Sequence, residues 1–150
     1  MNYTKEITDK VGIVNEVLDE IRIPRLLENP DFMVDEMSME SWLKVNLKDK
    51  GENKIPLSLT FTSTGLEVRL DRIGEALDWS NKNLKESNAV VKSMIKNLLT
   101  SHILVECYGS SQTRISVYGR DGKCTNNFKY QEILSFKGKR KDRLYFPVYS

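Results

Sequence analysis

The chain has 150 residues, of which 39% are hydrophobic and 29% charged, proportions that are ordinary for a soluble globular protein. This length is typical of one domain with a full hydrophobic core, so we expect a single domain over residues 1–150. Two cysteines are too few for a disulfide framework, and no apolar run reaches the roughly 18 residues of a membrane span. The charged opening lacks the apolar region of a signal peptide, so we expect a cytoplasmic protein with no membrane partner.

The net charge of +2 hides an asymmetry between the two ends of the chain. Residues 1–40 hold four basic and ten acidic residues, whereas residues 91–150 hold eleven basic and four acidic ones. Such a division bears on solubility and on partners rather than on fold. One interpretation is that a charged end serves a partner of opposite charge. The other is that the two ends neutralise each other in the fold.

Apolar residues at spacings of three and four predict an amphipathic helix from about residue 5 to residue 22. Lys10 is expected on its polar face. Pro24 cannot continue the backbone hydrogen bonding, so the helix should end just before it. The stretch that follows, residues 24–37, reads as a linker. The apolar stripe of the helix consists of Ile7, Val11, Val14, Val17, Leu18 and Ile21.

From Trp42 onward the period changes from 3.6 to 2, which indicates strands. Alternating runs at residues 43–47, 55–61 and 66–70, joined by polar turns, predict an antiparallel meander with one buried face. Residues 71–83 break the alternation, and their apolar spacing suggests a short helix that Gly74 weakens. A clearer helix begins near residue 86, because four apolar residues follow at i, i+3, i+4 and i+7: Val91, Met94, Ile95 and Leu98.

The last third of the chain reads as strands again. Alternating runs precede and follow a turn near residue 110, and Asp121-Gly122 is a strong hairpin signal before a weaker strand that starts at Cys124. A basic loop at residues 136–143 leads to an aromatic strand. The order of elements predicts an α+β fold with an antiparallel sheet of about six or seven strands, a meander and then C-terminal hairpins. The N-terminal amphipathic helix and one or two central helices should pack with this sheet.

An enzyme active site would have to be built around His102, the only histidine. Cys107 lies five positions later in the same expected strand, so the two side chains should face opposite sides of a sheet. Cys124 lies in a later strand and can approach either residue. Free cysteines are more often buried structural residues, the His and Cys spacing matches no zinc site, and no glycine-rich phosphate loop is present. We therefore expect no enzyme, no cofactor and no metal.

The segment Leu26–Ser41, called the acidic segment below, holds five acidic residues, three methionines and no basic residue. Its carboxylates lack the spacing and the central glycine of a calcium loop. Methionine adapts readily to different surfaces, and acidic side chains accelerate encounter with a basic partner. The alternative is a solvated linker that Met and Phe anchor to the core. We expect a partner-binding surface formed by Asp31, Asp35, Glu36 and Glu40, with Phe32 and Met37 as apolar anchors.

A small α+β chain with no catalytic set and a charged flank fits a bacterial immunity or antitoxin protein. We therefore expect an inhibitor that neutralises a toxin or effector with a basic face, such as a nuclease, by stoichiometric binding. The alternative is a nucleic-acid-binding protein, because basic residues lie beside aromatic ones near the C-terminus. That site would use Lys137, Lys139, Arg140, Lys141 and Arg143.

Overall fold

The computed structural model describes residues 2–70, 73–78, 84–108, 112–119, 122–131 and 140–149. The chain divides into two compact units. Unit 1 comprises residues 1–49 and 56–96, and unit 2 comprises residues 50–55 and 97–150. The expectation of a single domain stays a prediction.

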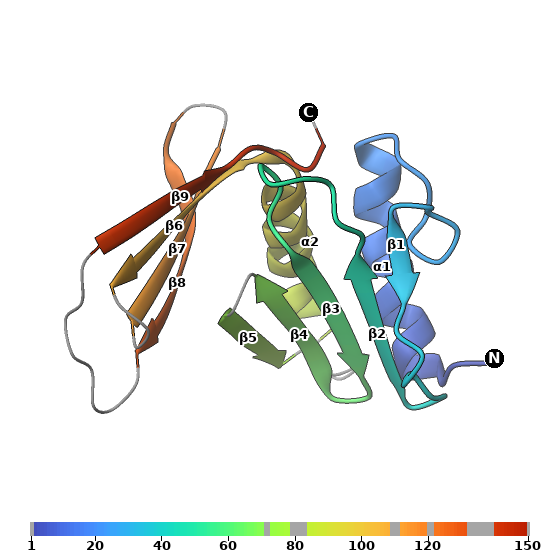
Figure 1. Cartoon of the computed structure of the whole chain (residues 1–150). Coiled ribbons are helices and arrows are strands. Elements are labelled where there is room, and N and C mark those ends of the chain that lie inside the picture. Colours follow the sequence, from blue (N-terminus) through green and yellow to red (C-terminus); the bar gives the residue numbers. More distant parts are fainter. Residues whose placement is uncertain are drawn as a thin grey trace. The chain divides into compact units, whose positions relative to one another are not determined.

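Unit 1 combines a five-stranded antiparallel sheet with helix α1 and the first part of helix α2 (Figure 1). The strand order is β1-β2-β3-β4-β5, so each strand pairs with its neighbour in sequence. The elements are α1 (Lys5–Glu20), β1 (Phe32–Val34), β2 (Trp42–Leu47), β3 (Leu57–Thr62), β4 (Gly65–Leu70), β5 (Ile73–Asp78) and α2 (Leu84–Thr100).

The core of unit 1 lies between α1 and one face of this sheet. The apolar stripe of α1 is buried there, and β2, β3 and β4 bury alternate side chains against it, as their period of 2 predicts. Each such aliphatic or aromatic side chain stabilises the fold by about 1.5–3 kcal/mol. The core includes Ile7, Val14, Val17, Leu18, Leu43, Val45, Leu59, Phe61, Leu66 and Val68.

Lys10 corrects the prediction of a polar side chain on the outer face of α1. It is completely buried, and its Nζ donates hydrogen bonds to the carbonyl oxygens of Thr62 at 2.7 Å and Ser63 at 3.0 Å. Both carbonyls lie at the turn between β3 and β4. Burial lowers the pKa of Lys10, while the nearby charges of Glu6 and Asp9 act in the opposite direction. The lysine therefore ties the helix to a hairpin of the sheet.

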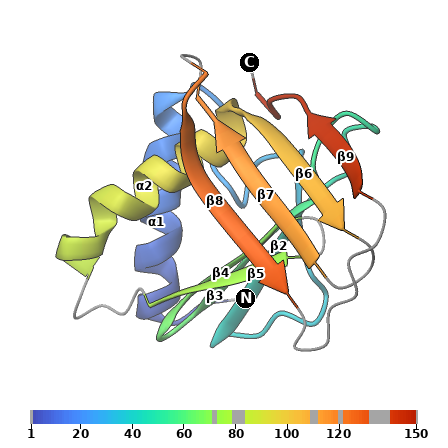
Figure 2. The ribbon, with the colours of Figure 1, turned by 90° about the vertical axis from the view of Figure 1, so that its left-hand side faces the viewer.

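Unit 2 is built on a four-stranded antiparallel sheet in the order β8-β7-β6-β9 (Figure 2). The strands are β6 (His102–Tyr108), β7 (Gln112–Tyr118), β8 (Cys124–Gln131) and β9 (Arg140–Tyr145). Strand β9 returns to pair with the side of β6 that β7 leaves open. The end of α2 and residues 50–55 complete the unit. Its buried apolar residues include Ile55, Leu98, Leu99, Ile103, Val105, Ile115, Val117, Tyr145 and Val148.

The hairpin predicted at the Asp-Gly pair joins β7 and β8 and is confirmed. The Gly119 N–H donates to the Lys123 carbonyl at 3.0 Å, and the Gly122 N–H donates to the Gly119 carbonyl at 2.9 Å. Gly122 has a φ of 79°, a backbone conformation that glycine adopts without steric cost. The turn residue at this position therefore has a conformational reason to be glycine.

The predicted α+β class, N-terminal helix, antiparallel meander and central helix are confirmed. The predicted short helix is wrong, because residues 73–78 form β5 and all six pair with β4. Continuous sheet pairing outweighs a helical pattern that Gly74 already weakens. The strands also separate into two sheets, of five and four strands in the described ranges, where one sheet was expected.

Two further differences concern segments that were read as loops. The predicted linker contains β1, and the predicted basic loop overlaps β9 from residue 140. Residues 136–139 of that loop lie outside the described part of the chain. Of the helices that the structure describes, neither is long and apolar enough to cross a bilayer.

Candidate functional site

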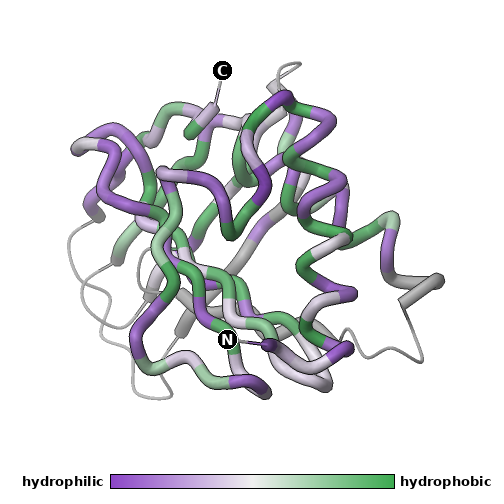
Figure 3. Tube along the Cα trace, turned by 90° about the vertical axis from the view of Figure 1, so that its right-hand side faces the viewer, coloured by the Kyte–Doolittle hydropathy of each residue, from purple (hydrophilic) through white to green (hydrophobic). Residues whose placement is uncertain are grey.

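The acidic segment lies in unit 1, where it contributes strand β1 and the connection from β1 to β2 (Figure 1). Strand β1 is the outermost strand of the five-stranded sheet and pairs with β2 from Phe32↔Leu47 to Val34↔Val45. Figure 3 views the molecule from the β1 side and shows hydrophobic and hydrophilic residues interleaved along the trace. The segment is therefore a folded edge of the sheet, with apolar and acidic residues close together.

Two side chains hold the connection between β1 and β2 in place. The Asp35 carboxylate accepts hydrogen bonds from the Met37 N–H at 2.9 Å and from the Asn46 side-chain amide at 3.4 Å. The Ser38 hydroxyl accepts a hydrogen bond from the Lys44 N–H at 3.1 Å. Short polar side chains commonly stabilise turns in this way. Asp35, predicted as a partner contact, is half-buried and has a structural role in this turn.

Five residues of the connection are exposed: Glu36, Met37, Met39, Glu40 and Ser41. Met37 is 73% exposed, and Met39 and Met33 are each 55% exposed. Among the residues that the structure describes, no hydrogen bond or ion pair involves the carboxylate of Glu36 or Glu40. Adaptable apolar side chains thus lie beside unpaired negative charges.

Phe32 does not form part of this surface. It was predicted as an apolar anchor for a partner, but it is only 8% exposed and lies opposite the buried Leu47. The prediction for Phe32 is wrong, because its ring belongs to the core of unit 1. Met33 follows it on the opposite face of β1 and is the exposed residue there. Asp31 is half-buried, and its carbonyl accepts the Lys48 N–H at 2.8 Å.

Other acidic residues near the N-terminus are paired within unit 1. Glu16 of α1 lies 3.0 Å from the Lys92 ammonium of α2, and Glu20 lies 3.6 Å from that of Lys96. The hydrogen bond that Lys92 donates to the Glu16 carboxylate raises the pKa of Lys92, and the charges of Glu16 and Glu20 add to this effect. Neutralisation between the acidic and basic parts of the sequence therefore occurs between α1 and α2.

The predicted nucleic-acid site is described only in part. Lys137 and Lys139 lie outside the described residues, and Arg140 begins β9. Lys141 and Arg143 follow in β9 and are exposed. Alternation along the strand places these two on one face and Asp142 on the other.

Arg143 already has partners within unit 2. Its guanidinium donates a hydrogen bond to the Glu52 carbonyl at 2.6 Å and lies 5.0 Å from the centre of the Tyr145 ring. Tyr145 is only 3% exposed, so its ring cannot stack on a base without rearrangement. Single-strand recognition requires accessible rings beside free cations. In this part of β9, Arg143 and Tyr145 make contacts that stabilise unit 2.

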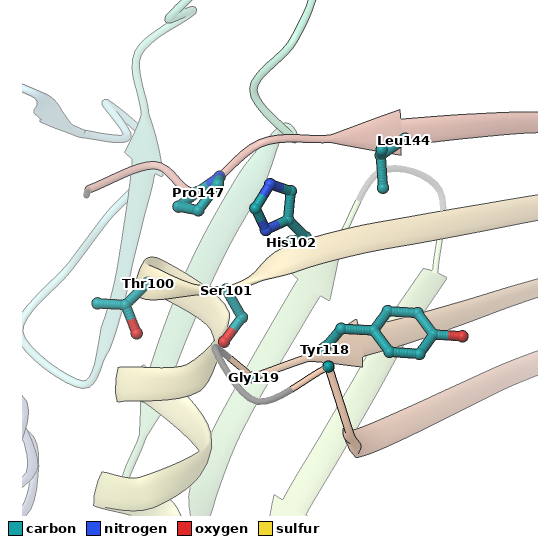
Figure 4. Close-up of a pocket in the computed structure, with 8 residues that line it drawn as sticks. Thr100, Ser101, His102, Tyr118, Gly119, Leu144 and Pro147 are labelled. Atoms are coloured by element: carbon teal, nitrogen blue, oxygen red, sulfur yellow. The ribbon is translucent and has the colours of Figure 1, made fainter.

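Unit 2 also contains a pocket of about 560 Å³ (Figure 4). Figure 4 shows the His102 ring and the Ser101 hydroxyl pointing to opposite sides of the chain, with the Tyr118 hydroxyl directed away from both. The His102 ring packs edge-on against Phe146, with ring centres 5.3 Å apart. Binding and catalytic pockets have polar groups that converge on one point, which these do not. The pocket is lined by Thr100, Ser101, His102, Tyr118, Gly119, Gly122, Leu144 and Pro147.

The cysteines and the histidine are not brought together in the described ranges. Cys124 of β8 and His102 of β6 both lie opposite Tyr118 of β7, so their backbones are two strand spacings, about 10 Å, apart. Cys107 is half-buried, with the Thr113 hydroxyl 3.9 Å from its sulfur. No three His, Cys, Asp or Glu side chains of this part of the chain form a group suited to a metal ion.

No protein-family model matches the chain, and neither a curated protein nor a solved structure matches it. The function therefore has to follow from the side chains themselves. The acidic segment combines exposed methionines with two carboxylates, those of Glu36 and Glu40, that have no partner in the described residues.

Proposed function

We propose that the chain is a cytoplasmic protein-binding module that neutralises a toxin or effector with a basic face by stoichiometric binding. The observation that supports this proposal is the exposed surface of the acidic segment. There, Met33, Met37 and Met39 accompany Glu36 and Glu40, and no basic residue occurs between residues 26 and 41. Clustered exposed apolar side chains with a polar rim are typical of protein-interaction sites.

An inhibitor of this kind needs a surface complementary to its partner and a fast association rate, and it needs no catalytic group. Unpaired carboxylates accelerate the encounter with a basic partner, with association rates up to about 10⁸–10⁹ M⁻¹s⁻¹ at low salt. Methionine side chains then adapt to the apolar centre of the partner's face. A protein that acts on nucleic acid or another anionic substrate has a basic active site, so it fits both features of this surface.

The proposal is tested by reversing the two unpaired charges. Wild-type protein and a Glu36→Lys/Glu40→Lys variant are tagged and used to capture partners from the lysate of the source organism at low and moderate salt. We expect one protein captured in stoichiometric amount by the wild type, and at least tenfold less of it by the variant. Asp35 is left unchanged, because its carboxylate holds the turn.

A Glu52→Lys/Glu67→Lys variant is the matched control. It changes the net charge by the same amount at two other exposed residues and should capture the partner as well as the wild type does. Equal loss in both variants would mean that overall charge, and not this surface, governs capture. Undiminished capture by Glu36→Lys/Glu40→Lys would remove the acidic segment from the proposal.

Bound nucleic acid is assayed in the same experiment. Binding to phosphates weakens steeply as salt rises, because it is driven by release of counterions. Nucleic acid that is retained at low salt, released at moderate salt and lost in a Lys141→Glu variant would favour the basic part of β9 instead.

A further inference from the structure

The free edge of β1 carries backbone groups that can be located from the hydrogen bonds to β2. The Lys48 N–H donates to the Asp31 carbonyl at 2.8 Å, and the Asp35 N–H donates to the Lys44 carbonyl at 2.8 Å. In an antiparallel pair, every second residue bonds across to the neighbouring strand. Residues 31, 33 and 35 therefore direct their N–H and C=O groups toward β2, and residues 32 and 34 direct theirs away from it.

The groups that point away from β2 are largely unused. The Phe32 N–H donates to the Asn29 carbonyl at 3.2 Å. Within the part of the chain that the structure describes, no hydrogen bond uses the Phe32 carbonyl, the Val34 N–H or the Val34 carbonyl. Val34 as a residue is 39% exposed. One donor and two acceptors thus lie in a row along an accessible edge.

We propose that an extended segment of the partner pairs with β1 at this edge and becomes a sixth strand of the sheet of unit 1. This inference rests on the proposed function, since it states how the acidic segment holds its partner. Added strands gain affinity from backbone hydrogen bonds and specificity from alternate side chains. Because β1 has only three residues, the contacts must extend to the side chains of Met37 and Met39.

The surroundings of β1 fix the chemistry of the added strand. Its side chains alternate between the two faces of the sheet. On the Val34 side they extend the apolar layer that Phe32 begins, so apolar β-branched residues fit there. Where the added strand passes the connection after β1, the carboxylates of Glu36 and Glu40 have no partner in the described residues, so basic residues fit there. The partner segment is therefore an extended stretch in which lysine or arginine alternates with valine or isoleucine.

The probe for this inference is the capped peptide acetyl-Lys-Val-Lys-Val-Lys-Val-amide, titrated into the full-length ¹⁵N-labelled protein at low salt. We expect the largest chemical-shift changes between residues 33 and 37. At saturation, hydrogen exchange of the Val34 amide should slow at least tenfold, because that N–H becomes bonded. Shift changes confined to other residues, or an unchanged Val34 exchange rate, would overturn the inference.

A pair of substitutions tests the same backbone group. Val34→Pro removes an N–H that β2 does not use, and proline is tolerated on an edge strand in this orientation. We expect its peptide affinity to fall at least tenfold, whereas Val34→Thr, which keeps the N–H, should stay within twofold of the wild type. If Val34→Pro lowers the midpoint of urea unfolding, the exchange measurement on the wild type decides the question alone.

The Glu36→Lys/Glu40→Lys variant separates this inference from the proposed function. If Val34→Pro binds the peptide normally while the charge-reversed variant does not, the surface acts through side chains only. The inference is then wrong and the proposed function stands. If neither variant loses the peptide, and the charge-reversed variant also captures the partner protein undiminished, both fail.

Discussion

Strands β1 and β9 are both edge strands in charged surroundings, but their charges are used differently. Beside β9, the Arg143 guanidinium is engaged by the Glu52 carbonyl and the Tyr145 ring. Beside β1, the carboxylates of Glu36 and Glu40 have no such partner in the described residues. A run of like charges in a sequence therefore does not establish a binding surface. What matters is whether the fold already uses those charges.

The edges also differ in their backbone groups. Just beyond β9, the Phe146 N–H donates to the Asn53 carbonyl at 2.8 Å, so residues 50–55 accompany that side of unit 2. Along β1, the Val34 N–H and carbonyl remain available in the part of the structure described. The two edges thus differ in how far the fold already uses their backbone groups.

The largest expected effect on stability is the difference between a buried residue of β1 and an exposed residue of the connection that follows it. Phe32→Ala should lower the free energy of unfolding by about 3–5 kcal/mol, because it removes a core aromatic ring. Met37→Ala, at a side chain that is 73% exposed, should change it by less than about 0.5 kcal/mol. Urea unfolding followed by circular dichroism measures both. A similar loss in the two variants would contradict the division between core and surface.

A smaller effect is expected at Lys10, a cation that unit 1 uses internally. Lys10→Ala leaves two carbonyls without their donor and opens a cavity, so it should cost about 2–4 kcal/mol of unfolding free energy. Lys10→Met keeps most of the apolar volume and serves as the matched variant. It should be less destabilised than Lys10→Ala in the same urea experiment. Near-neutral behaviour of both would mean that the bonds to Thr62 and Ser63 contribute little.

The pH dependence of stability gives Lys10 an independent signature. Its folded-state pKa is below the ordinary value of 10.5, so between these two values the unfolded chain binds more protons than the folded one. Stability should therefore rise with pH across this window. The rise should be absent in Lys10→Met when the wild type and the variant are compared at each pH. An identical slope in both proteins would assign the effect to other groups.

The smallest expected effect on stability tests whether the contacts of Arg143 in β9 stabilise unit 2. Arg143→Ala should cost about 1 kcal/mol, since it removes a charged hydrogen bond and a contact with an aromatic ring at an exposed position. Lys141→Ala, two residues earlier in the same strand, should change the free energy of unfolding by no more than about 0.5 kcal/mol. Thermal unfolding of both variants tests this difference. Equal midpoints would show that the Arg143 contacts do not stabilise unit 2.

Periodicity predicted the elements that bury a continuous face. The stripe of α1, the alternation of β2, β3 and β4, and the spacing from Val91 to Leu98 all belong to side chains that are buried at regular intervals, which leaves a periodic pattern in the sequence. Residues 73–78 follow both a strand and a helix pattern, and only their pairing with β4 decides between them. Strand β1, with three residues, is too short for a period to be recognised.

The candidate site could be predicted by composition but not by orientation. Charge and methionine content drew attention to the acidic segment, and Glu36, Met37 and Glu40 are exposed there. Phe32 is buried and Asp35 stabilises the turn. Both facts depend on the direction in which each side chain points, and that direction is fixed once residues 32–34 pair with β2. Adjacent residues of a strand point to opposite faces, which would have separated the buried Phe32 from the exposed Met33. This rule could not be applied because the segment was predicted as a linker.

The bonds of Lys10 have a consequence for the alignment of the β3–β4 hairpin. A hairpin that slips by one residue turns its buried face outward, so the apolar pattern of β3 and β4 already opposes such a slip. A single ammonium group that binds the carbonyls of two consecutive residues, Thr62 and Ser63, recognises one position of the turn relative to α1. In a slipped hairpin this charge would be buried without acceptors. The buried Lys10 thus adds a polar constraint on the alignment of this hairpin to the one that the apolar side chains impose.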